Sequence, residues 1–329
     1  MTLLLSRTDV ESVLTMKETI AIVEEAFRQF ALGNAIMPQR TAIRTEVYHG
    51  LHLGMPAYIG GDVNALGLKV VCIYPDNPSR FKLPTTIGTL LLTDPQTGVP
   101  LAVMDAGYLT AMRTGAVSGV ATNYLARKDA KRVGVFGAGV QASTQLWAVC
   151  TARSIEQAVV YDIDQARARA WADQMTSKLG VPVSVASEPR RAVDGMDIVV
   201  AATVSTTPIF DGKWLSPGTH VNGIGSHSPG ARELDTETIV RSKVFPDLRS
   251  ACLIEAGDLI IPIKEGALTE DRLAADLGEV VAGLKPGRES AEEITLFKSV
   301  GLAIQDVSTA SNVYRTAKEK GIGKEFSFF

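Results

Sequence analysis

The chain has 329 residues, of which 46% are hydrophobic and 21% charged, and its formal net charge at pH 7 is −3. This length exceeds what one hydrophobic core usually serves, so we expect two domains. The weakly acidic balance excludes a general attraction to nucleic acid or to anionic membranes, and no apolar run suits a membrane span or a signal peptide. Three widely spaced cysteines indicate reduced, buried thiols, so a cytoplasmic enzyme is the expected class.

The first third of the sequence predicts one helix followed by several strands. A capping box from Thr15 to Glu18 begins the helix, and Gly33 is a plausible end. A dense turn cluster covers residues 75–80, and a long helix rich in alanine and glycine is expected over 109–125. The expected strands lie within residues 40–58 and at 65–74, 86–93 and 100–104.

From Lys131 onward the sequence predicts alternating strands and helices. Short apolar strands are expected at residues 132–136, 157–161, 184–186, 197–201, 220–223 and 243–246, with helices over 141–150 and 164–179. Such alternation is typical of an α/β fold with a doubly wound, Rossmann-type parallel sheet covered on both faces. Residues 296–320 predict one long helix, too long for a crossover, which we expect to return to the first domain.

The sharpest motif runs from Gly137 to Ala142 and has the form G-x-G-x-x-A between a predicted strand and a predicted helix. Gly137 permits a tight turn, Gly139 lets the backbone approach a pyrophosphate, and Ala142 keeps the helix close to the strand. The diphosphate would lie against the helix N-terminus, where free amides favour negative charge. In this context the motif predicts dinucleotide binding.

An acid ends the second strand of this unit, at Asp162, and 162 − 142 = 20 residues separate it from the end of the motif. Its carboxylate can accept from both ribose hydroxyls of NAD and would repel a 2′-phosphate. We therefore predict NAD(H) as the cofactor, with NADP left possible by the nearby Arg167 and Arg169. The structural alternative is that Asp162 caps the following helix.

Further motifs follow one another in fixed order along nearly the whole chain. They are Met37-Pro38-x-Arg40, Met55-Pro56-Ala57, Lys69, Leu83-Pro84-Thr85, Thr97-Gly98-x-Pro100-Leu101-Ala102-x-Met104-Asp105, Leu109-Thr110-x-x-Arg113-Thr114-Gly115-Ala116, Gly278-Glu279-Val280 and Gly301-Leu302-Ala303-Ile304-Gln305-Asp306. In these motifs the chain resembles the ornithine cyclodeaminase/μ-crystallin family, which also contains archaeal-type alanine dehydrogenases and cyclic-imine reductases. The C-terminal third is most similar to the alanine dehydrogenase branch.

The resemblance implies a homodimer with two domains in each subunit. A substrate-binding and dimerisation domain would comprise residues 1–113 with 306–329, and a Rossmann NAD-binding domain would comprise residues 114–305. The strand and helix pattern is compatible with this division.

Three cations, Arg40, Lys69 and Arg113, stand in apolar or small-residue surroundings. A substrate with a carboxylate beside a C=N carbon needs such cations, and arginine suits bidentate carboxylate binding. Lys69, flanked by Leu68 and Val70, could have a lowered pKa and exchange a proton with the substrate nitrogen. The residues alone leave a structural role equally open for each cation, whereas the resemblance implies that all three bind the substrate carboxylate.

The predicted cofactor site extends beyond the glycine motif. The resemblance implies that Thr85, Arg113 and Thr114 lie near the cofactor. Together with positions assigned from the motif and from the ends of later strands, the predicted cofactor-binding set is Thr85, Arg113, Thr114, Gly137, Gly139, Val140, Gln141, Asp162, Thr203 and Gly225.

His227 departs from the family pattern, because cyclodeaminases and alanine dehydrogenases of the family carry an aspartate there, whereas μ-crystallin-like ketimine reductases do not. Histidine titrates near neutral pH and could protonate an imine nitrogen. It could instead contact nicotinamide or ribose, or be an inert loop residue. The departure puts ornithine deamination in doubt. His49, His52 and His220 have no evident partners, and no metal site is predicted.

The favoured hypothesis is an enzyme that transfers hydride between NAD(H) and the α-carbon of a small amino or imino acid. Reduction of a cyclic imino acid, Δ1-pyrroline-2-carboxylate to proline, is the first expectation. An alanine-type amino-acid dehydrogenase, an ornithine cyclodeaminase that yields proline and ammonia, and a non-catalytic nucleotide- or ligand-binding protein remain as alternatives.

Overall fold

The computed structural model describes residues 1–328 and divides the chain into two compact units. Unit 1 comprises Met1–Arg113 with the segment that begins at Leu302, and unit 2 comprises Thr114–Gly301. The first division lies where the sequence analysis placed it, and the second lies four residues before the expected residue 306. Within the described chain, no helix combines the length and apolar character needed to cross a membrane.

Unit 1 is built on one sheet with the strand order β15-β1-β7-β6-β5-β4-β2, and β3 also pairs with β4. All neighbouring strands are antiparallel except β1 and β7. The strands are β1 (Thr2–Leu5), β2 (Ala35–Ile36), β3 (Thr41–Thr45), β4 (Gly50–Ile59), β5 (Ala65–Ile73), β6 (Thr86–Thr93), β7 (Pro100–Asp105) and β15 (Lys324–Phe326).

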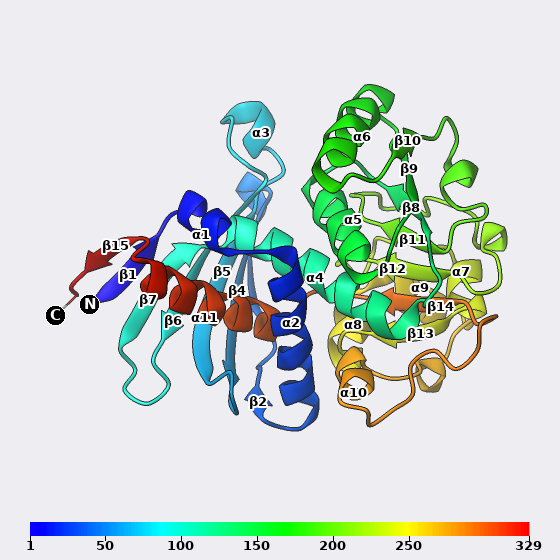
Figure 1. Ribbon diagram of the computed structural model, residues 1–329. Coiled ribbons are helices and arrows are strands. Elements are labelled where there is room, and N and C mark those ends of the chain that lie inside the picture. The colour runs from blue at the N-terminus through cyan, green and yellow to red at the C-terminus, as the bar shows by residue number, and fades with distance from the viewer. Residues whose placement is uncertain (329) are drawn as a thin grey trace. The chain divides into compact units, whose positions relative to one another are not determined.

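Helices α1 (Arg7–Val13), α2 (Met16–Ala31) and α11 (Ala303–Lys320) belong to unit 1, with the short α3 (Asn77–Arg80) and η1 (Glu46–Tyr48). The hydroxyl of Thr15 accepts from the Glu18 amide at 3.3 Å, as expected for the start of α2, whereas the Glu18 carboxylate accepts from the Thr15 hydroxyl at 2.7 Å in place of the Thr15 amide that a capping box uses. Helix α11, coloured orange to red in Figure 1, packs on β4 and β5 beside the blue α2 although almost the whole chain separates them.

Strand alternation places one predicted site residue in the core of unit 1. On β5, Gly67, Lys69 and Val71 are buried, whereas the intervening Leu68 and Val70 are half-buried. Because successive side chains of a strand point to opposite faces, Lys69 lies on the buried face, which packs against α11. The buried environment of Lys69 therefore comes from the packing of this face against α11.

Unit 2 is a seven-stranded sheet with the order β10-β9-β8-β11-β12-β14-β13, and every pairing in it is parallel. The strands are β8 (Arg132–Phe136), β9 (Gln157–Tyr161), β10 (Val183–Val185), β11 (Ile198–Ala201), β12 (His220–Gly223), β13 (Lys243–Pro246) and β14 (Thr295–Lys298). The order reverses direction between β8 and β11. In such sheets ligands bind outside the carboxyl ends of the strands at this point.

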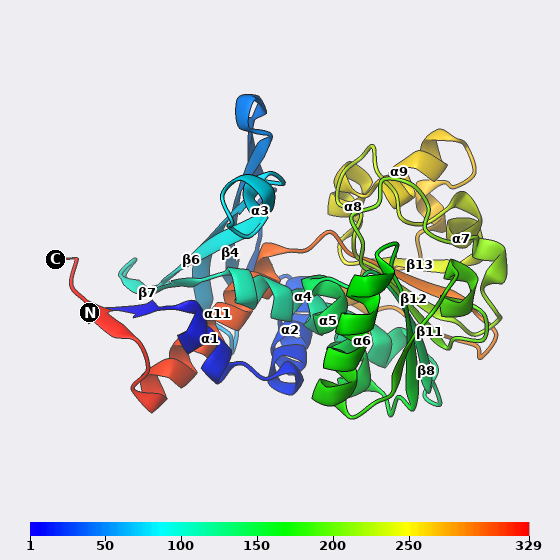
Figure 2. The ribbon, with the colours of Figure 1, turned by 90° about the horizontal axis from the view of Figure 1, so that it is seen from above.

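Helices cover both faces of this sheet (Figure 2). One apolar core joins the sheet to α5 (Val140–Ala152) and α6 (Gln165–Leu179), and a second joins it to α7 (Thr236–Arg241), α8 (Arg249–Glu255) and α9 (Gly257–Lys264). Helix α4 (Gly107–Leu125) begins in unit 1 and continues into unit 2. The remaining elements are α10 (Leu277–Val281), η2 (Pro189–Ala192), η3 (Gly212–Trp214) and η4 (Glu270–Arg272).

The prediction of one helix over residues 296–320 is wrong in its first part. Residues Thr295–Lys298 form β14, which lies between β12 and β13, and α11 begins only at Ala303. Gly301 has φ +82°, a left-handed conformation that ends the strand segment before the helix. The apolar side chains that suggested a helical face instead fill a central strand buried on both sides, where periodicity cannot separate the two structures. The expected return of the helix to the first domain is confirmed.

Candidate active site

A buried cluster of charges lies in unit 1 between β5, α4 and α11. Lys69 Nζ is 2.7 Å from Asp306 Oδ2, and Arg113 Nε is 2.8 Å from Asp306 Oδ1. Arg113 Nη1 also donates to Gln305 Oε1 at 2.6 Å. The side chains of Lys69 and Asp306 are 1% and 0% exposed. When Lys69 is protonated, two cations thus share one carboxylate out of water, which leaves this cluster with an excess positive charge that suits a substrate carboxylate.

Burial lowers the pKa of Lys69 to about 7, with a further contribution from the charge of Arg113 and a smaller one from Arg40, while Asp306 acts in the opposite direction. The lowered pKa agrees with the sequence analysis, but its cause differs. Leu68 and Val70 point to the other face, so the desolvation of Lys69 comes from its packing under α11. The half-buried Arg40 is close enough for its charge to act on Lys69.

Sequence reasoning did not assign a site role to Asp306. It appeared only within the motif before the C-terminal helix, yet its carboxylate organises both buried cations. A signal was available, because Asp306 lies in the first turn of α11 between the buried apolar residues Ile304 and Val307. An acid on the apolar face of a helix needs a buried partner.

The glycine motif of unit 2 forms the turn from β8 into α5. Gly137 has φ +97°, and a Cβ there would lie 2.7 Å from the Ala202 carbonyl oxygen. Gly139 precedes the first residue of α5, and a Cβ at Gly139 would meet no protein atom within 4 Å. Val140 is 68% exposed, and Gln141 follows it in the first turn. Open space therefore lies before a helix N-terminus, and these residues fit a dinucleotide diphosphate.

Asp162 directly follows the neighbouring strand β9 and faces this motif. Its Oδ2 accepts from the Ala138 amide at 2.9 Å, and its Oδ1 accepts from the Asp164 amide at 2.9 Å. Arg167 Nη2 lies 2.8 and 3.0 Å from the two oxygens. Asp164, not Asp162, caps α6 through the Ala166 and Arg167 amides, so the capping alternative for Asp162 is wrong.

Thr203, Gly225 and His227 lie in the loops that follow β11 and β12. The first two both bond to the buried Glu233, a residue that sequence reasoning missed and for which no local signal existed. His227 is exposed, and its Nδ1 lies 2.9 Å from the Gly225 carbonyl oxygen.

The remaining predicted cofactor residues are distributed over both units. Thr114 is buried in α4, and its carbonyl accepts from Gln145 Nε2 at 2.8 Å. Thr85 and Arg113 belong to unit 1, where Thr85 is exposed before β6. The roles of these three residues toward the cofactor stay predictions.

His220 has a structural environment. It is fully buried, with hydrogen bonds to Thr295 and Asn222, and burial lowers its pKa to about 3. Over residues 1–328 the side chains of His, Cys, Asp and Glu form no group of three or more suited to a metal ion.

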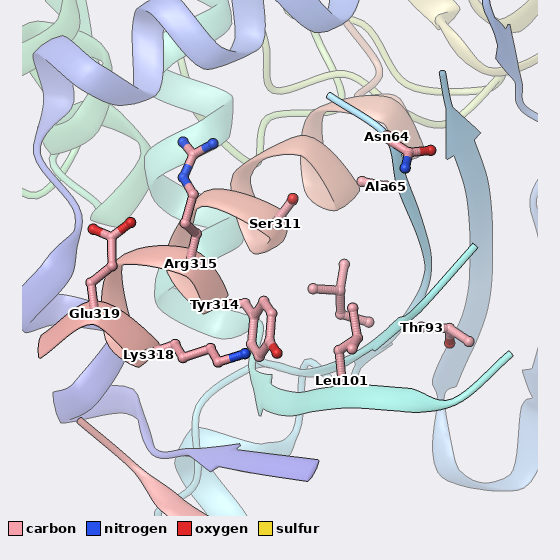
Figure 3. Close-up of a pocket in the computed structure, with 10 residues that line it drawn as sticks. Asn64, Ala65, Thr93, Leu101, Ser311, Tyr314, Arg315, Lys318 and Glu319 are labelled. Atoms are coloured by element: carbon pink, nitrogen blue, oxygen red, sulfur yellow. The ribbon is translucent and has the colours of Figure 1, made fainter. Parts of the chain in front are cut away.

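A hollow of about 480 Å³ lies on unit 1, and the residues that line it differ from those of the charge cluster (Figure 3). The C-terminal half of α11 contributes Tyr314, Arg315 and Lys318, and Leu101 lines the strand side. None of the predicted site residues lines it, so we assign it no part in the chemistry.

The chain is similar to known proteins over nearly its whole length. A solved structure of Thermococcus litoralis Δ1-pyrroline-2-carboxylate reductase with NADH and L-proline is 49% identical, with a TM-score of 0.96 over 99% of this chain and 100% of that one. A solved archaeal alanine dehydrogenase dimer with bound NAD is 40% identical, with a TM-score of 0.94 over 100% and 99% of the two chains. Alanine dehydrogenase of Archaeoglobus fulgidus is 41% identical over 100% of this chain and 99% of its own. The profile of the ornithine cyclodeaminase/mu-crystallin family matches residues 1–321, and the chain therefore belongs to that family.

Proposed function

We propose that this chain uses NADH to reduce the C=N bond of a small cyclic imino acid, with Δ1-pyrroline-2-carboxylate as substrate and proline as product. The observation that carries the proposal is the buried Lys69–Asp306–Arg113 cluster in a chain whose other unit has a dinucleotide cradle. The likeness to the Thermococcus litoralis reductase, whose structure holds NADH and L-proline, supports this choice of substrate.

The residues of the chain would bind the substrate carboxylate and supply a proton. Bound NADH supplies the hydride that the α-carbon receives. Arg113 and Arg40 pair with the carboxylate, for which guanidinium groups have the matching geometry. Lys69, whose pKa is about 7, and His227 are the groups that exchange a proton with the substrate nitrogen. One hydride and one proton together convert the C=N bond into CH–NH.

The deciding experiment follows NADH absorbance in the presence of purified protein and freshly prepared Δ1-pyrroline-2-carboxylate. We expect NADH to be consumed and proline to accumulate in equal amounts, and we expect Lys69→Met to lose most of this turnover. Release of ammonia from ornithine without net change in NADH would instead identify a cyclodeaminase. NADH binding without turnover of any of these substrates would refute the enzymatic proposal.

The second candidate is an alanine-type amino-acid dehydrogenase, favoured by the 41% identity to the Archaeoglobus fulgidus enzyme. Pyruvate and ammonium form an α-imino acid that presents the same carboxylate and C=N carbon to the cation cluster. Consumption of NADH with pyruvate and ammonium, but not with the cyclic imine, would move the assignment to this activity.

We further propose that the chain forms a homodimer and acts in the cytoplasm. Several large apolar side chains of unit 1 are exposed on β2, β3, η1 and β6, namely Ile36, Ile43, Val47, Tyr48 and Ile87. Exposed apolar residues in such number are typical of protein–protein interfaces. The archaeal alanine dehydrogenase neighbour is a dimer. Three free cysteines are compatible with a reducing compartment.

A further inference from the structure

One buried carboxylate joins the two loops that carry predicted residues after β11 and β12. Glu233 lies between β12 and α7 and is 0% exposed. Its Oε1 accepts from the Thr203 amide and from the Thr203 hydroxyl, each at 2.6 Å. Its Oε2 accepts from the Gly225 amide at 2.6 Å. Because β11 and β12 are neighbouring parallel strands, this side chain crosslinks the sheet edge at which the cofactor is expected.

Gly225, which Glu233 holds through its amide, also contacts the His227 side chain. The Gly225 carbonyl lies 2.9 Å from His227 Nδ1, and since a carbonyl can only accept, Nδ1 carries a hydrogen. The other ring nitrogen, Nε2, is then the one that can release or take up a proton. A Cβ at residue 225 would lie 2.3 Å from Glu233 Oε2 and 2.3 Å from the Thr203 carbonyl oxygen, so only glycine permits this approach.

A buried ion pair fixes the main chain at Glu233 independently of its carboxylate. Asp258 Oδ1 accepts from the amides of Glu233 and Leu234 at 2.8 and 3.0 Å. Asp258 Oδ2 is 2.7 Å from Lys298 Nζ, and both side chains are 0% exposed. Lys298 ends β14 beside Gly223 at the end of β12. A change of the Glu233 side chain should therefore alter the crosslink without releasing the segment.

We propose that Glu233 is a positioning residue of the reaction. Its carboxylate holds Thr203 and Gly225, and through Gly225 the His227 imidazole, in the arrangement that cofactor binding and proton transfer require. This inference rests on the proposed function, in which His227 exchanges a proton, and on the sequence-based prediction that Thr203 and Gly225 contact the cofactor.

The charge of Glu233 adds a pH dependence to this crosslink. Burial raises the pKa of Glu233 to about 7, with a smaller contribution from Asp258, while the Thr203 hydrogen bonds and Lys298 act in the opposite direction. A proton on the carboxyl group removes accepting capacity, so one of the three donors is left poorly satisfied. The crosslink is complete above about pH 7 and weakens below it.

The test is Glu233→Gln, which keeps the size of the side chain but leaves one accepting oxygen for donors on both loops. At about pH 8 we expect the Kd for NADH, measured by fluorescence titration without substrate, to rise about fivefold, and kcat to fall about tenfold. Glu265→Gln is the matched control, because that carboxylate also lies in unit 2 but is 43% exposed and bonds only to Arg232 and Thr236 in the contacts described. Its Kd and kcat should not change.

A pH profile separates positioning from a general structural role. Both proteins carry Lys69→Met and His227→Asn, which remove the two side chains proposed to exchange a proton. In this background, NADH affinity should improve as pH rises through about 7 when Glu233 is present. It should not depend on pH when Glu233→Gln is added. Unchanged Kd and kcat in folded Glu233→Gln would overturn the proposal. If Glu233→Gln fails to fold, as judged by circular dichroism, a pH-independent NADH affinity in the background protein would overturn it instead. NADH binding needs no substrate, so a protein that binds NADH but reduces no imine would refute the proposed function alone.

Discussion

Replacement of Asp306 by asparagine tests whether the buried cluster has the electrostatic arrangement described. The substitution keeps the shape of the side chain and removes a negative charge that lies within 2.8 Å of both Lys69 and Arg113. Breaking a buried pair by removing one partner typically costs about 3–5 kcal/mol. Lys69 can lose its proton because its pKa is about 7, which partly relieves the repulsion, so we expect a loss near 3 kcal/mol.

The stability lost in Asp306→Asn should be larger at low pH than at high pH. The folded-state pKa of Lys69, about 7, lies below its ordinary value of 10.5, so the folded protein binds fewer protons between these limits and its stability rises with pH there. Without Asp306, which raises this pKa, the lysine should titrate at still lower pH. The stability difference between parent and Asp306→Asn should therefore be larger at about pH 6 than at about pH 8.5.

The assay is urea unfolding followed by far-UV circular dichroism at fixed protein concentration. Tryptophan fluorescence would report the wrong part of the chain, because Trp147, Trp171 and Trp214 all lie in unit 2. Asp62→Asn is the control, since Asp62 is exposed on the same unit. A loss below about 1 kcal/mol, or one that is equal at both pH values, would refute the ion-pair reasoning.

Four shorter predictions address the other parts of the proposed site. Gly139→Val should raise the Kd for NADH more than tenfold in titration calorimetry and leave the melting temperature unchanged, because its side chain enters open space. The kcat/KM of imine reduction should fall as pH rises above about 7, where Lys69 loses its proton, and this fall should be absent from the residual activity of Lys69→Met. Arg167→Ala should weaken NADPH more than NADH, because it removes the cation beside Asp162; equal weakening would argue against a role near the ribose. Ile43→Glu should convert a dimer to a monomer in analytical ultracentrifugation, and a monomeric parent would contradict the proposed assembly.

The dinucleotide unit could be predicted from sequence because its signals are local. The turn at Gly137, the helix that follows Gly139 and the acid at Asp162 all lie within one strand–helix–strand segment. The one large error concerns the first part of the helix predicted over residues 296–320, which forms β14 instead, because periodicity alone cannot separate a short buried strand from a buried helix segment. Only its place between β12 and β13 distinguishes them.

For the site, too, the local features could be predicted from the sequence and the long-range contacts could not. The sequence by itself identified Arg40, Lys69 and Arg113 as unusual cations, since each stands among apolar or small residues. It could not identify Asp306 as the common partner of Lys69 and Arg113, because these contacts join β5 and α4 to a helix near the end of the chain. The role of Glu233 could not be predicted from the sequence either, because it depends on hydrogen bonds from Thr203 and Gly225, which the fold places beside its carboxylate. Local motifs can be identified in the sequence, whereas the pairing and desolvation of charges depend on which distant segments the tertiary structure packs together.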